Sequence, residues 1–176
     1  PPEPFKSRYP ADPYRAEVAA MDEQLGRLIE AFDARPTAAG VPPAMLVTGD
    51  HGEGLGDHGE AQHGTLLYQS TMHVPLVLVG PGVASGEVAT PVSNRRVFHT
   101  LRDWAGQPSA ESLAVAEPEQ EVVIGEAMKP FLQFGWQPQI MTVSGSLKAI
   151  LSGRVEVYDL EADPREKHDL APGTSV

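Results

Sequence analysis

The chain has 176 residues, and its 13 lysines and arginines against 24 aspartates and glutamates give a formal net charge of −11. This negative charge argues against binding to nucleic acid and against direct contact with an anionic membrane, because nothing offsets phosphate repulsion. The absence of cysteine excludes disulfides, thiolate zinc sites and a cysteine nucleophile within these residues.

Apolar side chains at steps of three and four predict a first helix over residues 14–34. Asp12 as N-cap and Pro13 at the first helical position mark its start, and Pro36 and Gly40 mark its end. The apolar stripe, which we expect to face a core, consists of Val18, Met21, Leu25, Leu28, Ile29 and Phe32.

Two short apolar runs, 44–48 and 74–79, are bounded by glycine and proline and predict strands buried on both faces, as in a parallel sheet. A second helix follows, with Ser93 as its cap, Leu101 among its inward residues and Gly106 as its C-cap. This order of helices and strands indicates an α/β fold.

The pattern changes after a connection at residues 107–119. Four short β-prone segments follow, separated in part by tight turns at 144–146 and 152–154, and they predict an antiparallel meander. The segments are 121–126, 140–143, 147–151 and 155–158. We therefore expect an α/β part over residues 1–112 and a small antiparallel β subdomain over residues 113–176.

Residues 49–64 differ from the rest of the chain. They hold six glycines, three of the six histidines and four carboxylates, directly after the first predicted strand. Open α/β sheets place ligands at the carboxyl ends of their strands, and aspartate with histidine suits a divalent cation. The segment therefore predicts a metal site, and the alternative is an acidic surface loop with solvated histidines. For His58 alone, a structural role in holding the loop is the favoured interpretation.

The same region lacks positive charge. No lysine or arginine lies between Arg35 and Arg95, while five carboxylates do: Asp50, Glu53, Asp57, Glu60 and Glu87. An anionic substrate would be repelled unless a divalent cation reversed the local field. Any further positive charge must come from elsewhere in the fold or from chain outside this sequence.

Five blocks of sequence, in the same order, carry a resemblance to a known family. Their clearest motifs are Thr48-Gly-Asp50-His51-Gly, followed by His63-Gly, and Val157-Tyr-Asp-Leu160. Through them the chain resembles the sulfatase family of the alkaline phosphatase superfamily. The resemblance implies that residues 1–112 are the C-terminal part of an α/β core with a mostly parallel sheet and flanking helices.

The resemblance also implies roles for three residues. Asp50 and His51 match the paired metal ligands of the family, and His63 matches a residue that contacts the leaving group of the ester. The implied cofactor is a divalent metal ion. Calcium suits the carboxylate best, while the imidazole leaves manganese or zinc open.

One departure from the family matters. The nucleophile motif, Cys/Ser-x-Pro-x-Arg, does not occur in this sequence. We therefore expect the C-terminal portion of a larger hydrolase, which acts with the rest of the parent chain on a small-molecule or glycan sulfate ester. On its own this chain is expected to be inactive. The resemblance favours a periplasmic or otherwise extracytoplasmic location, which the residues themselves do not establish.

Two other functions stay open at this point. The first is a phosphoryl or phosphoglycerol transferase, or a phosphodiesterase, of the same superfamily. The second is a non-enzymatic module that binds a metal or a partner. A cluster of Phe131, Phe134 and Trp136 is expected to pack under the meander, with a lip that faces the substrate as the alternative.

Overall fold

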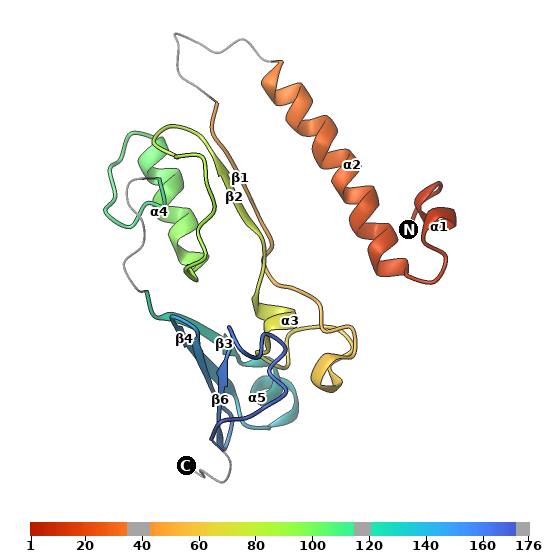
Figure 1. The fold of residues 1–176 in the computed structure, drawn as a ribbon, viewed down its shortest axis with the longest axis vertical. Coiled ribbons are helices and arrows are strands. Elements are labelled where there is room, and N and C mark those ends of the chain that lie inside the picture. The colour runs from red at the N-terminus through yellow and green to blue at the C-terminus, as the bar shows by residue number, and fades with distance from the viewer. Residues whose placement is uncertain (35–42, 115–120, 172–176) are drawn as a thin grey trace. The chain divides into compact units, whose positions relative to one another are not determined.

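The computed structural model describes residues 1–34, 43–114 and 121–171. The chain divides into two compact units, Pro1–Pro43 and Ala44–Val176 (Figure 1). Among the described residues, no helix combines the length and the apolar character needed to cross a bilayer. The boundary expected between residues 112 and 113 stays a prediction.

The first unit consists of two helices, α1 (Phe5–Arg8) and α2 (Pro13–Asp33). The predicted start of α2 is confirmed, because the Asp12 side chain accepts a hydrogen bond from the Arg15 amide at 2.9 Å. The predicted stop residues, Pro36 and Gly40, lie outside the described part of the chain.

Half of the apolar stripe of α2 is exposed, because three of its six residues, Val18, Met21 and Leu28, are uncovered. The small core is formed by Phe5, Ala16 and Ala20, which do not belong to the predicted stripe. Met21 and Leu28 are 66% and 65% exposed. The helix was therefore predicted correctly, whereas these two side chains of its apolar face meet no core here.

The second unit begins with two paired strands, β1 (Met45–Thr48) and β2 (Leu76–Val79). They pair antiparallel, with Met45 opposite Val79, which corrects the expectation of a parallel pair buried on both faces. Short apolar runs indicate burial but not the direction of the neighbouring strand. Val77 and Val79 are also half exposed, so β2 is covered on one face only.

Helix α4 (Arg95–Trp104) follows this pair. Asn94, one residue later than predicted, occupies its N-cap, and its side-chain amide donates to the carbonyl of Gly49 at 2.9 Å. Gly106 follows the helix with a φ of +81°, as its predicted role requires. Leu101, predicted to point inward, is instead exposed.

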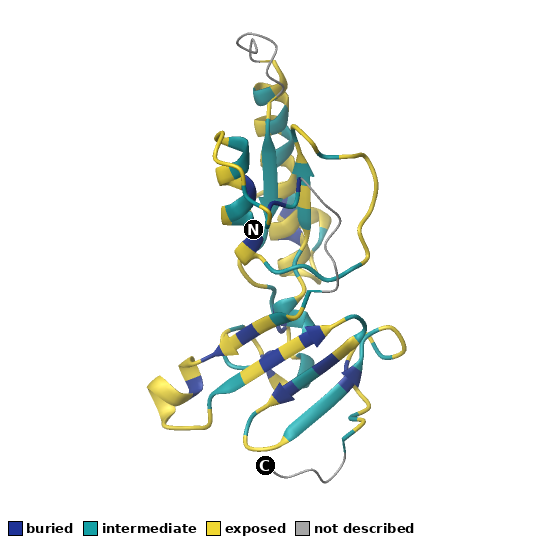
Figure 2. Cartoon of the chain, turned by 90° about the vertical axis from the view of Figure 1, so that its left-hand side faces the viewer, coloured by how far each residue is buried: buried dark blue, intermediate teal, exposed yellow. Residues whose placement is uncertain are grey.

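The predicted meander is confirmed as a four-stranded antiparallel sheet in the order β3-β4-β5-β6. The strands are Val123–Ala127, Gln139–Ser144, Leu147–Leu151 and Val155–Asp159. Exposed residues alternate with buried or partly buried ones along β3 and β4, most clearly in β4 (Figure 2). The sheet therefore buries one face only.

The chain after β1 covers the buried face of this sheet. Leu67, 2% exposed, packs there with sheet residues, and Tyr68 and Met72 lie beside it. The sheet residues in this core are Ala127, Met141, Val143, Ile150 and Tyr158. Tyr68 precedes the short helix α3 (Gln69–Met72), so the segment after the candidate loop is fixed to the C-terminal sheet.

Helix α5 (Lys129–Phe134) connects β3 to β4. Phe131, Phe134 and Trp136, in and just after this helix, are 51%, 54% and 61% exposed. The expectation that they pack under the meander is therefore wrong, because the segment Leu67–Met72 occupies that face instead.

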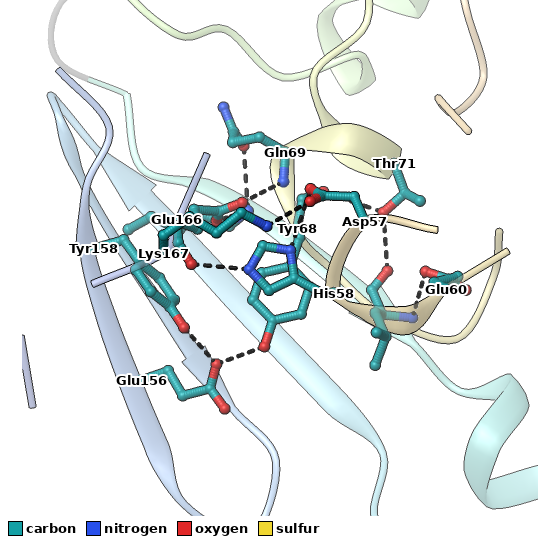
Figure 3. Close-up of polar contacts among 12 residues, drawn as sticks. Asp57, His58, Glu60, Tyr68, Gln69, Thr71, Glu156, Tyr158, Glu166 and Lys167 are labelled. Atoms are coloured by element: carbon teal, nitrogen blue, oxygen red, sulfur yellow. Dashed lines mark hydrogen bonds and ion pairs between the residues drawn. The ribbon is translucent and has the colours of Figure 1, made fainter. Parts of the chain in front are cut away.

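A carboxylate joins this segment to the sheet. Tyr68 and Tyr158 donate hydrogen bonds to the same Glu156 oxygen, at 2.7 and 2.8 Å (Figure 3). Burial alone would raise the pKa of Glu156, but these two bonds and those from Arg154 outweigh it and lower that pKa. Burial raises the pKa of both tyrosines.

We predict that Glu156 makes stability depend on pH. Because its pKa is lower in the folded than in the unfolded protein, its stabilisation is complete above the ordinary value of 4.5 and is lost as the pH falls through the lowered folded pKa. Urea unfolding across this range should give a free-energy difference between wild type and Glu156→Gln that shrinks toward acid. Glu161→Gln, which changes an exposed glutamate, is the control. A difference that stays constant with pH would contradict this role of Glu156.

Candidate active site

The loop after β1 folds back on the segment that precedes β2. The amides of Gly52 and Glu53 donate to the carbonyls of Thr71 and Ser70, at 2.8 and 3.0 Å. A Cβ at position 52 would overlap the Ser70 carbonyl oxygen, so the close approach of these two chains requires glycine. This folding places the start of the histidine-rich loop beside α3.

The three residues predicted for the site lie together. The rings of His51 and His63 are stacked, with centroids 3.9 Å apart and an interplanar angle of 28°. His51 Nε2 lies 3.6 Å from Asp50 Oδ2. The Asp50 side chain is 90% exposed, so its carboxylate is accessible from solvent.

His63 has a carboxylate partner within the loop. Its Nδ1 lies 3.2 Å from one oxygen of Glu53 and 3.3 Å from the other. This contact orients the ring and leaves Nε2 as the atom that can reach a ligand. The sequence alone marks Glu53 only as one of the negative charges of the loop, because its spacing of ten residues from His63 shows no periodic pattern.

Asp50 and His51 fit a divalent cation as part of a ligand set. His51 Nδ1 lies 2.9 Å from the carbonyl of Gly52, and a hydrogen bond to that carbonyl leaves Nε2 as the atom with a lone pair. In the described residues, no group of three or more histidine, aspartate or glutamate side chains converges on one point. Asp50 and His51 are therefore the candidate ligands of this chain, and their binding to a metal ion stays a prediction.

Comparison with known proteins bears on the family. A family model described as Sulfatase matches residues 2–107, which is more than half of the chain. The chain belongs to the sulfatase family. The match includes the loop with Asp50, His51 and His63.

Two curated sulfatases show the same likeness. Choline-sulfatase of Rhizobium meliloti is 29% identical over 171 residues, which are 90% of this chain and 32% of that protein. Arylsulfatase K of Danio rerio is 35% identical over 102 residues, 57% of this chain and 19% of that protein. The chain thus spans about a third or less of the length of these sulfatases.

A solved structure shows the fold of this sulfatase chain. It is the complex of a protein with its substrate D-glucosamine-2-N,6-O-disulfate, and it matches with a TM-score of 0.72 at 22% identity. The match covers 91% of this chain and 36% of the other. Residues on both sides of 112 therefore belong to a fold that this solved structure shares.

Glu60, whose role the sequence did not reveal, fixes the far side of the loop. The side chain is buried, and its two oxygens accept hydrogen bonds from the amides of Thr65 and Leu66, at 2.8 and 3.1 Å. Glu60 therefore sets the path of the chain just after His63. In the sequence it was one of five acidic residues, and nothing marked it as buried.

His58 and its neighbours attach the loop to the C-terminal tail (Figure 3). His58 Nε2 lies 2.8 Å from the Glu166 carbonyl, and its ring is stacked on Tyr68. These contacts bear out the structural role predicted for this histidine. Asp57 accepts a hydrogen bond from Lys167 at 2.5 Å, which lowers the pKa of Asp57.

We predict that Gly52→Ala lowers the free energy of unfolding by about 2 kcal/mol, because the added methyl group overlaps the Ser70 carbonyl and the backbone must move. The matched control is Gly26→Ala in α2, where a Cβ meets nothing within 4 Å. That change should leave stability equal or raise it by up to about 1 kcal/mol. Urea unfolding measures both, and equal stability of the two variants would contradict the close approach at Gly52.

Proposed function

We propose that the protein carrying this chain hydrolyses sulfate esters with a divalent metal ion as cofactor. One observation carries the proposal: a single loop of a sulfatase-family chain brings Asp50, His51 and His63 together, with the two imidazoles stacked at 3.9 Å. The names of two similar proteins, choline-sulfatase and arylsulfatase K, support a small-molecule sulfate ester as substrate. The glucosamine disulfate bound in the similar solved structure supports a glycan sulfate ester.

Asp50 and His51 are the proposed metal ligands of this chain. A carboxylate favours calcium, and an imidazole ligand would equally suit manganese or zinc. A bound divalent ion would supply the positive charge that the acidic loop lacks and would offset the charge of the sulfate oxygens. Asp50 offers an exposed carboxylate, and His51 offers Nε2.

His63 is the proposed contact for the leaving group. Glu53 holds its Nδ1 side, so Nε2 faces away from the carboxylate and is the atom that would donate a hydrogen bond or a proton to the ester oxygen. Such donation stabilises the negative charge that develops on that oxygen as its bond to sulfur breaks.

We assign no nucleophile to these residues. The Cys/Ser-x-Pro-x-Arg motif does not occur in the sequence, so the proposed reaction needs the rest of the parent chain. This chain alone is accordingly proposed to be inactive, with the roles of Asp50, His51 and His63 realised in the longer protein.

We predict that His63→Ala lowers kcat about 100-fold in the protein expressed from its whole reading frame. The loss should be larger for an alkyl sulfate than for phenyl sulfate, because the poorer leaving group depends more on a proton donor. His168→Ala, which removes a histidine with an 83% exposed side chain, is the matched control and should keep wild-type activity. Steady-state kinetics on the two esters measure these effects.

The same assay tests the metal. Chelation should abolish hydrolysis, added Ca²⁺, Mn²⁺ or Zn²⁺ should restore it, and Asp50→Asn should require more of that ion. Hydrolysis that survives chelation would refute the proposed role of Asp50 and His51 as metal ligands. Turnover of phenyl phosphate but not phenyl sulfate would favour the phosphoryl chemistry instead, and metal binding without any turnover would favour a non-enzymatic module.

A further inference from the structure

The candidate site carries negative charge that nothing inside its loop offsets. Of the loop carboxylates, Asp57 is paired with Lys167, and Glu60 is buried with its oxygens engaged by two backbone amides. Asp50 and Glu53 remain next to the stacked histidines. A cation held by Asp50 would still leave the negative charge of Glu53 uncompensated. A further positive group at this place would therefore favour the binding of an anionic ester.

Besides Lys167, which pairs with Asp57, the fold brings a second lysine, Lys129, to this loop. It is the first residue of α5, and its Nζ donates to the carbonyl of His63 at 3.4 Å, across 66 residues of sequence. A Cβ built on Gly64 would lie 3.4 Å from its Cδ and 3.6 Å from its Nζ. Its ammonium group therefore sits against the peptide between His63 and Gly64.

Lys129 differs from the other lysines of its unit in what it contacts. Lys148 and Lys167 each have a carboxylate oxygen within 2.7 Å. Among the described residues, the ion pairs within 4.0 Å do not include Lys129, and its side chain is exposed. Its positive charge is therefore available to a ligand at the loop.

We propose that Lys129 is an anion-binding residue of this site, whose ammonium group contacts the sulfate oxygens of the substrate. The proposal rests on the proposed function. An ammonium group has three donors, of which the His63 carbonyl takes one, so two remain for oxygens of an ester beside that residue. A lysine binds such a group as a compact point charge, and arginine in its place keeps the charge.

The test uses the protein expressed from its whole reading frame, with phenyl sulfate as substrate. Lys129→Met should raise KM about tenfold and weaken competitive inhibition by inorganic sulfate to the same extent, as expected for a lost charged hydrogen bond. Inhibition by phenol, the uncharged product, should stay at the wild-type value. Lys129→Arg should recover most of the sulfate affinity. Arg102→Met, which removes an exposed charge from α4, should change none of these values.

Two results would overturn the role of Lys129. One is an unchanged KM and sulfate inhibition in Lys129→Met, and the other is an equal loss of phenol and sulfate inhibition, which indicates a structural role. Should the wild-type protein hydrolyse no sulfate ester, the proposed function fails, and calorimetry with sodium sulfate then tests Lys129 directly. Sulfate binding that Lys129→Met loses would support the residue, whereas equal binding by both proteins, or none by wild type, would refute it.

Discussion

The buried ion pair between Lys148 and Glu166 connects the parts on which the site depends. The two side chains are at most 1% exposed, and Lys148 Nζ lies 2.7 Å from Glu166 Oε1. Burial lowers the pKa of Lys148, and the charge of Glu166 opposes that change. Glu166 also accepts a hydrogen bond from the Gln69 amide at 2.6 Å, while its carbonyl contacts His58 (Figure 3). Glu166 thus contacts β5, α3 and the loop. Removing one charge of such a buried pair lowers the free energy of unfolding by about 3 to 5 kcal/mol.

This anchor explains how a glycine-rich loop can hold the side chains of the candidate site in place. Glu60 fixes the chain after His63, and Glu166 fixes the start of α3. The carbonyls of Ser70 and Thr71 in α3 then accept hydrogen bonds from the amides of Glu53 and Gly52. Hydrogen bonds that a buried carboxylate accepts from backbone amides are strong, because the acceptor is charged. The carboxylate of Asp50 differs from these in being exposed, and we propose that it is the one that binds a ligand. Some acidic residues therefore hold the backbone of the loop in shape, whereas others are exposed and could bind a ligand.

The sequence predicted much of the fold and the identity of the clustered residues, but not their supports. Helix α2 and the meander follow from periodicity and turn residues, and the proximity of Asp50, His51 and His63 agrees with one short glycine-rich segment folding on itself. The antiparallel pairing of β1 with β2 could not be predicted, since apolar runs carry no direction. Glu166 follows the last predicted strand, and nothing in the sequence around it indicates burial. Its partners lie 18 and 97 residues away, a distance at which no local pattern marks a buried charge.

Hydrogen exchange tests most directly whether Glu166 holds the loop. The comparison is between wild type and Glu166→Ala, with Glu161→Ala, an exposed glutamate of the same segment, as control. If Glu166 holds the loop, Glu166→Ala should exchange faster at Gln69 and also at Gly52 and Glu53, while the amides of β4 stay protected. Unchanged protection of Gly52 and Glu53 in Glu166→Ala would contradict this role, because the loop would then keep its shape without this anchor.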